Sequence, residues 1–193
     1  MSERARDPRS LRTVSALQEA LRDLVRDRPL DAITVSELCR AAGVRRTTYY
    51  THFDGIPDQL TAMLIGPVAE AMSIDGPSAD VPSTALAFRA SVLAALRRIA
   101  ADRTVFRAAF GSATSASFRR ALAAALAERV AAALDVWAVF EVATDVDRAV
   151  AVPFVAGGLT LALEAWALSD AEDEATWESS MVRQMPPWWP QTT

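Results

Sequence analysis

Side chains that donate hydrogen bonds gather in one short stretch, RRTTYYTH, at residues 45–52. Two adjacent arginines are followed by threonines, tyrosines and a histidine, and no acidic residue interrupts the run. An arginine guanidinium matches phosphate and the guanine edge, and hydroxyl groups suit phosphate oxygens. The stretch therefore predicts a surface that faces a polyanion.

The place of the two arginines in their helix supports this prediction. A helix is expected from about Arg45 to His52, so that Arg45 and Arg46 stand in its first turn. The positive end of the helix dipole disfavours a cation there by roughly 0.3–1 kcal/mol each. An ordinary solvated polar face is the alternative, but a helix selected for stability alone would carry Asp or Glu at these positions.

The residues just before this stretch predict a second short helix that packs beside it. Thr34 and Glu37 have the spacing of a capping box, and Ile33 and Leu38 that of a hydrophobic staple. Gly43 is expected to end this helix, because glycine adopts the left-handed conformation without penalty. Two short helices joined by a glycine-centred turn form a helix-turn-helix.

The same residues carry a resemblance to a known family. GVRRTTYYTHF, residues 43–53, resembles the recognition helix of the TetR family of transcriptional repressors, and PLDAITVSELCRAA, residues 29–42, resembles its lead-in and first motif helix. The resemblance is specific over about Leu11 to Leu60. It implies that base edges are faced by Arg46, Thr47 and Thr48, and that phosphates are contacted by Thr34, Ser36, Tyr50 and His52.

Three residues depart from the family's pattern. Arg45 stands where a serine usually caps the recognition helix, although it still belongs to the expected DNA-binding surface. Tyr49 replaces a usual core leucine and needs room beside the first motif helix. Ile56 stands where many members place a lysine that binds phosphate, so we do not expect that contact.

The composition predicts an all-α protein of two parts. Ala, Leu and Val dominate, glycine is scarce, and 51% of the 193 residues are apolar. Residues 1–53 hold ten arginines and seven acidic residues, a net charge of +3, whereas the remainder holds ten and seventeen, a net charge of −7. We expect a three-helix DNA-binding head with a helix-turn-helix over residues 1–55. A helical-bundle domain for ligand binding and dimerisation would follow over residues 56–193.

Little in the sequence points to catalysis, a cofactor or a metal. His52 is the only histidine, which excludes a Ser-His-Asp or Cys-His arrangement in the body. No metal-ligand spacing or phosphate-binding glycine loop is present, so only carboxylate chemistry without a signature remains as an enzyme alternative. Cys39, the single cysteine, is expected to be a small buried residue.

We expect a cytoplasmic protein with no membrane partner. The N-terminus does not resemble a signal peptide. The stretch Ala149–Leu163 approaches the length of a membrane span, but Pro153 and the pair Gly157–Gly158 interrupt it.

The body is expected to contain five helices, at about Ser83–Ala101, Thr104–Gly111, Thr114–Trp137, Asp145–Leu168 and Glu172–Met185. Most of its large apolar side chains must form the core. A few are expected to line a cavity for an apolar effector, as the resemblance implies. The candidates are Met63, Phe88, Phe106, Phe110, Phe118 and Trp137.

One stripe of the penultimate helix is expected to form a homodimer interface. Phe154, Gly157, Gly158, Leu161 and Ala165 share a face, and each glycine costs about 1 kcal/mol of helix stability relative to alanine. Close approach of another helix, from this chain or from a twin, would offset that cost. The ending MPPWWP is too apolar to be fully solvated, so its tryptophans are expected to pack on the body or across a subunit boundary.

These features together predict a dimeric DNA-binding regulator, a repressor that a small, largely apolar effector releases from a palindromic operator on double-stranded DNA. The alternative from another class is a helical module that binds proteins and not DNA.

Overall fold

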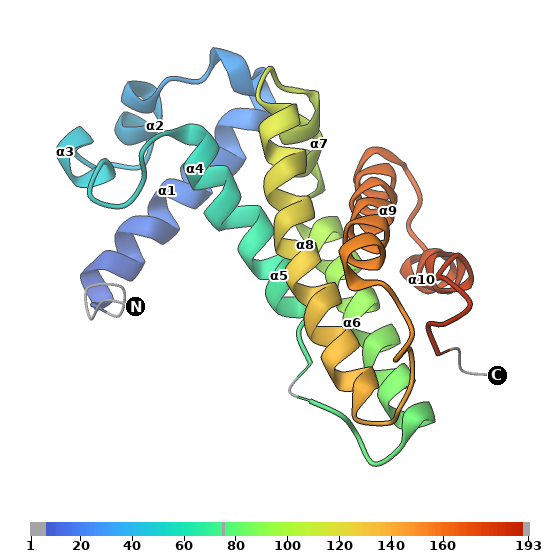
Figure 1. Cartoon of the computed structure of the whole chain (residues 1–193). Helices are drawn as coiled ribbons and strands as arrows, with labels where there is room; N and C mark the ends of the chain where they lie inside the picture. Colours follow the sequence, from blue (N-terminus) through green and yellow to red (C-terminus); the bar gives the residue numbers. More distant parts are fainter. Residues whose placement is uncertain (1–6, 75, 191–193) are drawn as a thin grey trace.

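The computed structural model describes residues 7–74 and 76–190, and every regular element in these ranges is helical. The all-α prediction is confirmed. Figure 1 shows α1, α2 and α3 at one end of the molecule and α9 and α10 toward the other, with α4 to α8 between them.

The head begins with α1, Pro8–Asp27, which the Asp7 carboxylate caps by accepting from the amide of Arg9. Its buried face includes Leu17, Leu21 and Val25. The chain then passes through a short 3₁₀ turn into α2, Val35–Ala41, and α3, Arg46–Tyr49. The second motif helix is shorter than predicted, because residues 50–52 form a hydrogen-bonded turn and not a further helical turn.

One irregular helix leads from the head into the body. It consists of α4, Ile56–Leu60, a π-helical segment, Thr61–Ile65, and α5, Gly66–Ala71. The amide of Gly66 donates to the carbonyl of Thr61, five residues back. Pro67 has no N–H to donate to the preceding turn, and its ring crowds the carbonyl four residues before it. Glycine followed by proline in the sequence predicts a kink here, and the structure shows the irregularity as a π-helical turn just before the proline.

The body consists of five helices, each within three residues of its predicted bounds at either end. They are α6, Val81–Ala101, α7, Arg103–Gly111, α8, Ser115–Ala138, α9, Arg148–Leu168, and α10, Glu174–Arg183. The closest pair is α8 with α9, and α10 packs mainly on α6.

Helix α9 runs unbroken through Pro153 and the two glycines, as the predicted helix over Asp145–Leu168 requires. By length and composition alone it is apolar enough to cross a membrane. One face is buried against the bundle, however, and Glu164 on that face accepts from Arg119 of α8 at 2.7 Å. These contacts are those of a core helix whose other face is left open.

Head and body are joined by polar contacts as well as by packing. The Arg22 guanidinium of α1 donates to both oxygens of the buried Asp102 carboxylate, at 2.6 and 3.2 Å, where α6 meets α7. Asp31 accepts from the amide of Ala113 beyond the end of α7. The buried Gln59 of α4 donates to the carbonyl of Leu17 of α1 at 3.0 Å. Helix α4 is thus attached to the head, although the expected head ends just before it.

Candidate functional site

The start of α2 is held by the capping box that the sequence predicts. The amide of Glu37 donates to the Thr34 hydroxyl at 3.3 Å, and the amide of Thr34 donates to the Glu37 carboxylate at 3.0 Å. Arg28 donates to the other carboxylate oxygen at 2.9 Å. The hydrogen bonds from Thr34, and then that from Arg28, lower the pKa of Glu37 from its ordinary 4.5 to about 2. The helix therefore keeps its cap at neutral pH.

The corner between α2 and α3 depends on Gly43, which has a φ of +65°. The amide of Val44 donates to the carbonyl of Cys39 at 2.9 Å, and the amide of Gly43 donates to that of Arg40 at 3.3 Å. These two bonds are those of a Schellman motif, which satisfies the last carbonyls of a helix. The predicted glycine corner is confirmed, and it fixes the angle at which α3 leaves α2.

The eight residues predicted to contact DNA lie on or beside this motif. Five are exposed, and Ser36, Thr48 and His52 are half-buried. The eight are Thr34, Ser36, Arg45, Arg46, Thr47, Thr48, Tyr50 and His52.

No side chain caps the start of α3, where Arg45 is the N-cap residue. Arg46 follows it, exposed, with its guanidinium carbon 6.0 Å from the centre of the Tyr50 ring. The start of α3 thus presents backbone N–H groups and two cations on one exposed side, and its first turn contains no acidic residue. This surface suits phosphate and the major-groove edges of bases.

A rigid core lies behind this surface. Tyr49 is fully buried, and its ring centre is 5.7 Å from that of Phe53. The Tyr49 hydroxyl is buried with no hydrogen-bond partner among the residues that the structure describes, and burial raises its pKa. Ile56 is also buried, which agrees with the expectation that it makes no phosphate contact.

Among the residues that the structure describes, no cluster of His, Cys, Asp or Glu could hold a metal ion. Cys39 is buried in the core of the motif, as expected, and this burial raises the pKa of its thiol. Neither observation adds a catalytic group to those considered from the sequence.

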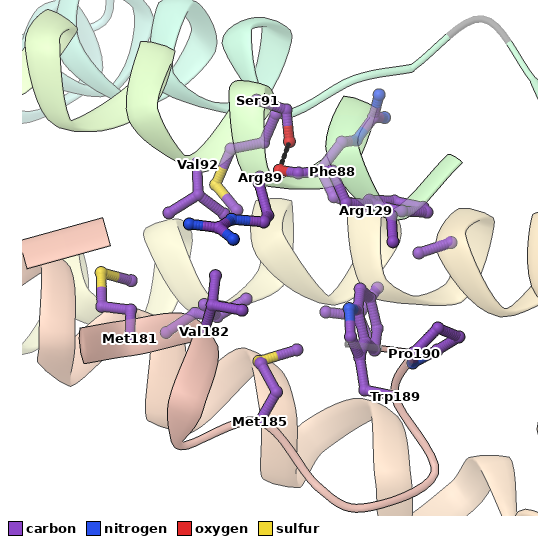
Figure 2. Close-up of a pocket in the computed structure, with 15 residues that line it drawn as sticks. Phe88, Arg89, Ser91, Val92, Arg129, Met181, Val182, Met185, Trp189 and Pro190 are labelled. Atoms are coloured by element: carbon purple, nitrogen blue, oxygen red, sulfur yellow. Dashed lines mark hydrogen bonds between the residues drawn. The ribbon is translucent and has the colours of Figure 1, made fainter. Parts of the chain in front are cut away.

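The body contains a cavity between α6, α8 and α10 (Figure 2), and only one of the six predicted pocket residues, Phe88, lines it. Met63, Phe106, Phe110 and Phe118 lie in the main hydrophobic core, and Trp137 packs behind Phe88. The prediction missed the contribution of α10 and the C-terminal segment, which supply Met181, Val182, Met185, Trp189 and Pro190. The apolar ending MPPWWP was the available signal, and Trp189 does pack on the body.

The predicted dimer stripe lies on the open face of α9. The exposed fractions are 64% for Val150, 71% for Phe154, 64% for Leu161 and 50% for Leu168. Beside it, a groove of about 560 Å³ runs between α9 and α10, with Gly158 and Phe154 on one side and Trp177 on the other.

The glycine pair on this helix has no close neighbour in the chain. A Cβ atom added at Gly157 or Gly158 would meet nothing within 4 Å. The described part of the chain therefore gives no packing reason for either glycine.

Comparison with known proteins gives no match to a protein-family model and none to a curated protein. Solved structures do share the fold. The dihydroxyacetone kinase operon activator DhaS is similar with a TM-score of 0.64 and 14% identity, covering 90% of this chain and 93% of that chain. The TetR family repressor AlkX from Dietzia sp. is similar with a TM-score of 0.56 and 16% identity, covering 91% of this chain and 94% of that chain. The fatty acid degradation regulator FadR from Bacillus halodurans is similar with a TM-score of 0.58 and 15% identity, covering 88% of this chain and 92% of that chain. At these identities the likeness concerns the fold, and it confirms the TetR-like resemblance of head and body together.

Proposed function

We propose that the protein is a cytoplasmic DNA-binding transcriptional regulator. It would bind a palindromic operator as a homodimer and leave it when a small, largely apolar effector binds the body. The observation that carries this proposal is the exposed, acid-free surface at the start of α3, set on a rigid buried core.

Roles for the surface follow from separating contacts that read bases from contacts that hold phosphates. Arg46, Thr47 and Thr48 would face base edges in the major groove. Phosphates on either side would be held by Thr34, Ser36, Tyr50 and His52, with Arg45 at the uncapped start of α3. The net charge of +3 on residues 1–53 would favour approach of the head, and the acidic body would stay away from the duplex.

The names of the structural neighbours support regulation of transcription. One is an operon activator, one a repressor implicated in the biodegradation of n-alkanes, and one a regulator of fatty acid degradation. Two of these names concern apolar compounds, which favours an apolar effector for a body with a mostly apolar cavity. We choose the repressor role because the motif of α3 resembles that of a repressor family.

A two-fold dimer would place two recognition helices on the DNA, so that together they contact enough base pairs to specify a site. One recognition helix contacts only a few base pairs, whereas a two-fold pair reads half-sites about 34 Å apart or a multiple of that. The glycine pair and the exposed side chains of α9 offer a self-complementary contact, because a two-fold interface uses the same patch on both subunits.

The effector would act through the irregular helix that joins head and body. Met72, just after α5, lines the body cavity, and the same helix reaches the head through Gln59 of α4. Thermodynamic linkage requires that an effector which weakens DNA binding binds less tightly to the DNA complex, by the same factor.

A titration of DNA binding against salt separates this proposal from a protein-docking module. A regulator that neutralises Z phosphates loses affinity with a slope of about −0.9Z in log K against log salt concentration. A docking module for proteins would bind no duplex at low salt, which would overturn the proposal.

The specific test is Arg46→Ala beside Tyr50→Phe, on a site selected from random DNA. Arg46→Ala should cost about 1–3 kcal/mol at the selected site and relax its preference over random DNA. Tyr50→Phe keeps the ring beside the Arg46 guanidinium but removes the hydroxyl, so it should weaken all sequences alike. An unchanged preference in Arg46→Ala would refute the base-reading role of Arg46.

A further inference from the structure

The body cavity is too small, as it stands, for an effector. Its volume is about 40 Å³, which is room for about three water molecules. Apart from Arg89, Ser91 and Arg129 its walls are apolar. Arg89 is held by the buried carboxylate of Glu178 on α10, at 2.8 and 3.0 Å. A ligand must therefore replace part of the wall.

The wall that a ligand can replace with least disturbance is the segment Pro186–Pro190. It follows α10 as a turn and coil, and the amide of Trp189 donates to the carbonyl of Pro186 within the segment. Figure 2 shows Trp189 and Pro190 entering the cavity from this coil, while Met181 and Met185 enter from the direction of α10. Moving the coil breaks no helix.

Trp189 occupies an aromatic site at one end of the cavity. Its ring centre is 5.3 Å from that of Phe88 and 5.9 Å from that of Trp137, both in edge-to-face geometry. Phe88 and Trp137 are themselves 4.9 Å apart. Trp189 is thus bound as a flat aromatic ligand would be, with its ring against two others.

One of the two rings that pack against Trp189 also carries a hydrogen-bond donor without a described acceptor. Trp137 is fully buried, and its Nε1 has no partner among the described residues. A buried N–H normally has a partner, and leaving it unpaired is unfavourable. The indole of Trp189 packs against Trp137 but cannot accept this hydrogen bond, because its nitrogen is only a donor.

We propose that Trp189 occupies the effector site, and that the effector is a flat aromatic molecule of about indole size that carries a hydrogen-bond acceptor. It would replace Trp189 against Phe88 and Trp137 and accept from Nε1 of Trp137. Binding itself depends only on these residues. Its effect on DNA rests on the proposed function.

The position of the site connects it to the dimer face. Leu159, Met181 and Met185 line both the cavity and the groove between α9 and α10. Pro186, at the start of the displaced segment, lines that groove as well. Displacement of Trp189 therefore changes the groove beside the proposed dimer interface.

Two probes of equal shape test the site. Quinoline has a ring nitrogen that accepts a hydrogen bond, and naphthalene has none. Trp189→Ala should bind quinoline at least about tenfold more tightly than the wild type, because the competing side chain is gone. That variant should prefer quinoline to naphthalene by roughly threefold to tenfold, the value of one hydrogen bond. Adding Trp137→Phe should abolish the preference.

A measurement on the unsubstituted chain does not depend on how these variants fold. In protein labelled with 5-fluorotryptophan, saturating quinoline should move the ¹⁹F resonance of Trp189 to the position of a solvent-exposed tryptophan and leave that of Trp166 in place. No gain in affinity in Trp189→Ala, or a Trp189 resonance that stays unchanged at saturation, would overturn the site. Equal affinities for quinoline and naphthalene would refute the proposal that the effector carries a hydrogen-bond acceptor. If quinoline binds as expected but operator affinity does not change, the site stands and the proposed release by an effector fails.

Discussion

Replacing Gly158 with leucine tests the dimer proposal with a change that the single chain accommodates. Gly158 is exposed on α9, and an added Cβ meets nothing within 4 Å. Glycine is less favourable than alanine in a helix interior by about 0.8–1.0 kcal/mol, and leucine ranks just below alanine. The monomer should therefore gain up to about 1 kcal/mol in its free energy of unfolding.

In a dimer that packs through this face, the same change should be strongly unfavourable. An extra side chain forced into a packed contact costs typically about 1–3 kcal/mol. A two-fold interface contains the change twice, so the dimer should lose about 2–6 kcal/mol. That loss raises the dimer dissociation constant by between about 30-fold and 10⁴-fold, and tight binding to a palindrome should be lost with it.

Sedimentation velocity across a concentration series measures this dissociation constant, and circular dichroism checks that the helical content is unchanged. Ala124→Leu is the matched control, because Ala124 is exposed on α8 with the charged residues Arg120 and Glu128 one turn away on either side. The control should leave the dissociation constant unaltered. A Gly158→Leu protein that dimerises as tightly as the wild type would show that another surface forms the dimer, and a wild type that is a monomer at micromolar concentration would refute the dimer itself.

Three further changes test parts of the structure that support these surfaces. Tyr49→Phe should raise the free energy of unfolding by about 1 kcal/mol in urea titrations, because it removes a buried hydroxyl without a partner; a loss would mean that the hydroxyl is bonded. Arg119→Ala should lower that energy by about 1–3 kcal/mol, since it leaves the buried Glu164 carboxylate without its ion pair, whereas Arg148→Ala in an exposed pair should cost less than about 1 kcal/mol. Glu37 has a pKa lowered to about 2 in the folded head, so its stabilising effect is complete above pH 4.5 and is lost as the pH falls toward 2. Glu37→Gln should therefore flatten the fall in stability over this range, and an unchanged pH profile would count against the capping role of the carboxylate.

The motif could be predicted from the sequence because its determinants are local. The capping box of Thr34 and Glu37 joins residues three apart, and the corner at Gly43 depends on amides three and five residues from their acceptors. Such bonds are encoded by residue type and spacing alone. The stripe of α9 could also be predicted, since the helical period and the two glycines are visible in the sequence.

The cavity could not be predicted in the same way, because its walls come from helices far apart in the chain. Phe106, Phe110 and Phe118 have the residue type of pocket-lining groups, yet they pack on one another with ring centres 5.1–6.4 Å apart. Phe88 differs from them only in facing α10 and Trp189 across the body. The residue type predicts that such a side chain is buried. Whether it lies in the core or lines a cavity depends on which residues it packs against in the folded protein.

The length of α3 and the form of the bend before Pro67 also escaped prediction. Helical periodicity continues through Tyr50 and His52, and the chain leaves the helix only because the amides of residues 51 and 52 bond to carbonyls three residues back. At Pro67 the sequence indicates a disturbed helix. It does not indicate that the disturbance takes the form of a π-helical turn.

Of the places in this chain where no described contact offsets a local cost, three could each be relieved by an outside partner. They are the arginines in the first turn of α3, the paired glycines of α9, and the unpaired indole N–H of Trp137. Local rules are broken chiefly at functional sites, and each cost is removed by a different outside partner: a polyanion, a second copy of the chain, or a ligand with an acceptor. The cavity beside Trp137 also contacts Met72 at the end of α5 and Met185 after α10. In the proposed dimer, a ligand there would touch both the helix that leads to the head and the wall of the groove beside the dimer interface, and these two elements together would set the distance between paired recognition helices.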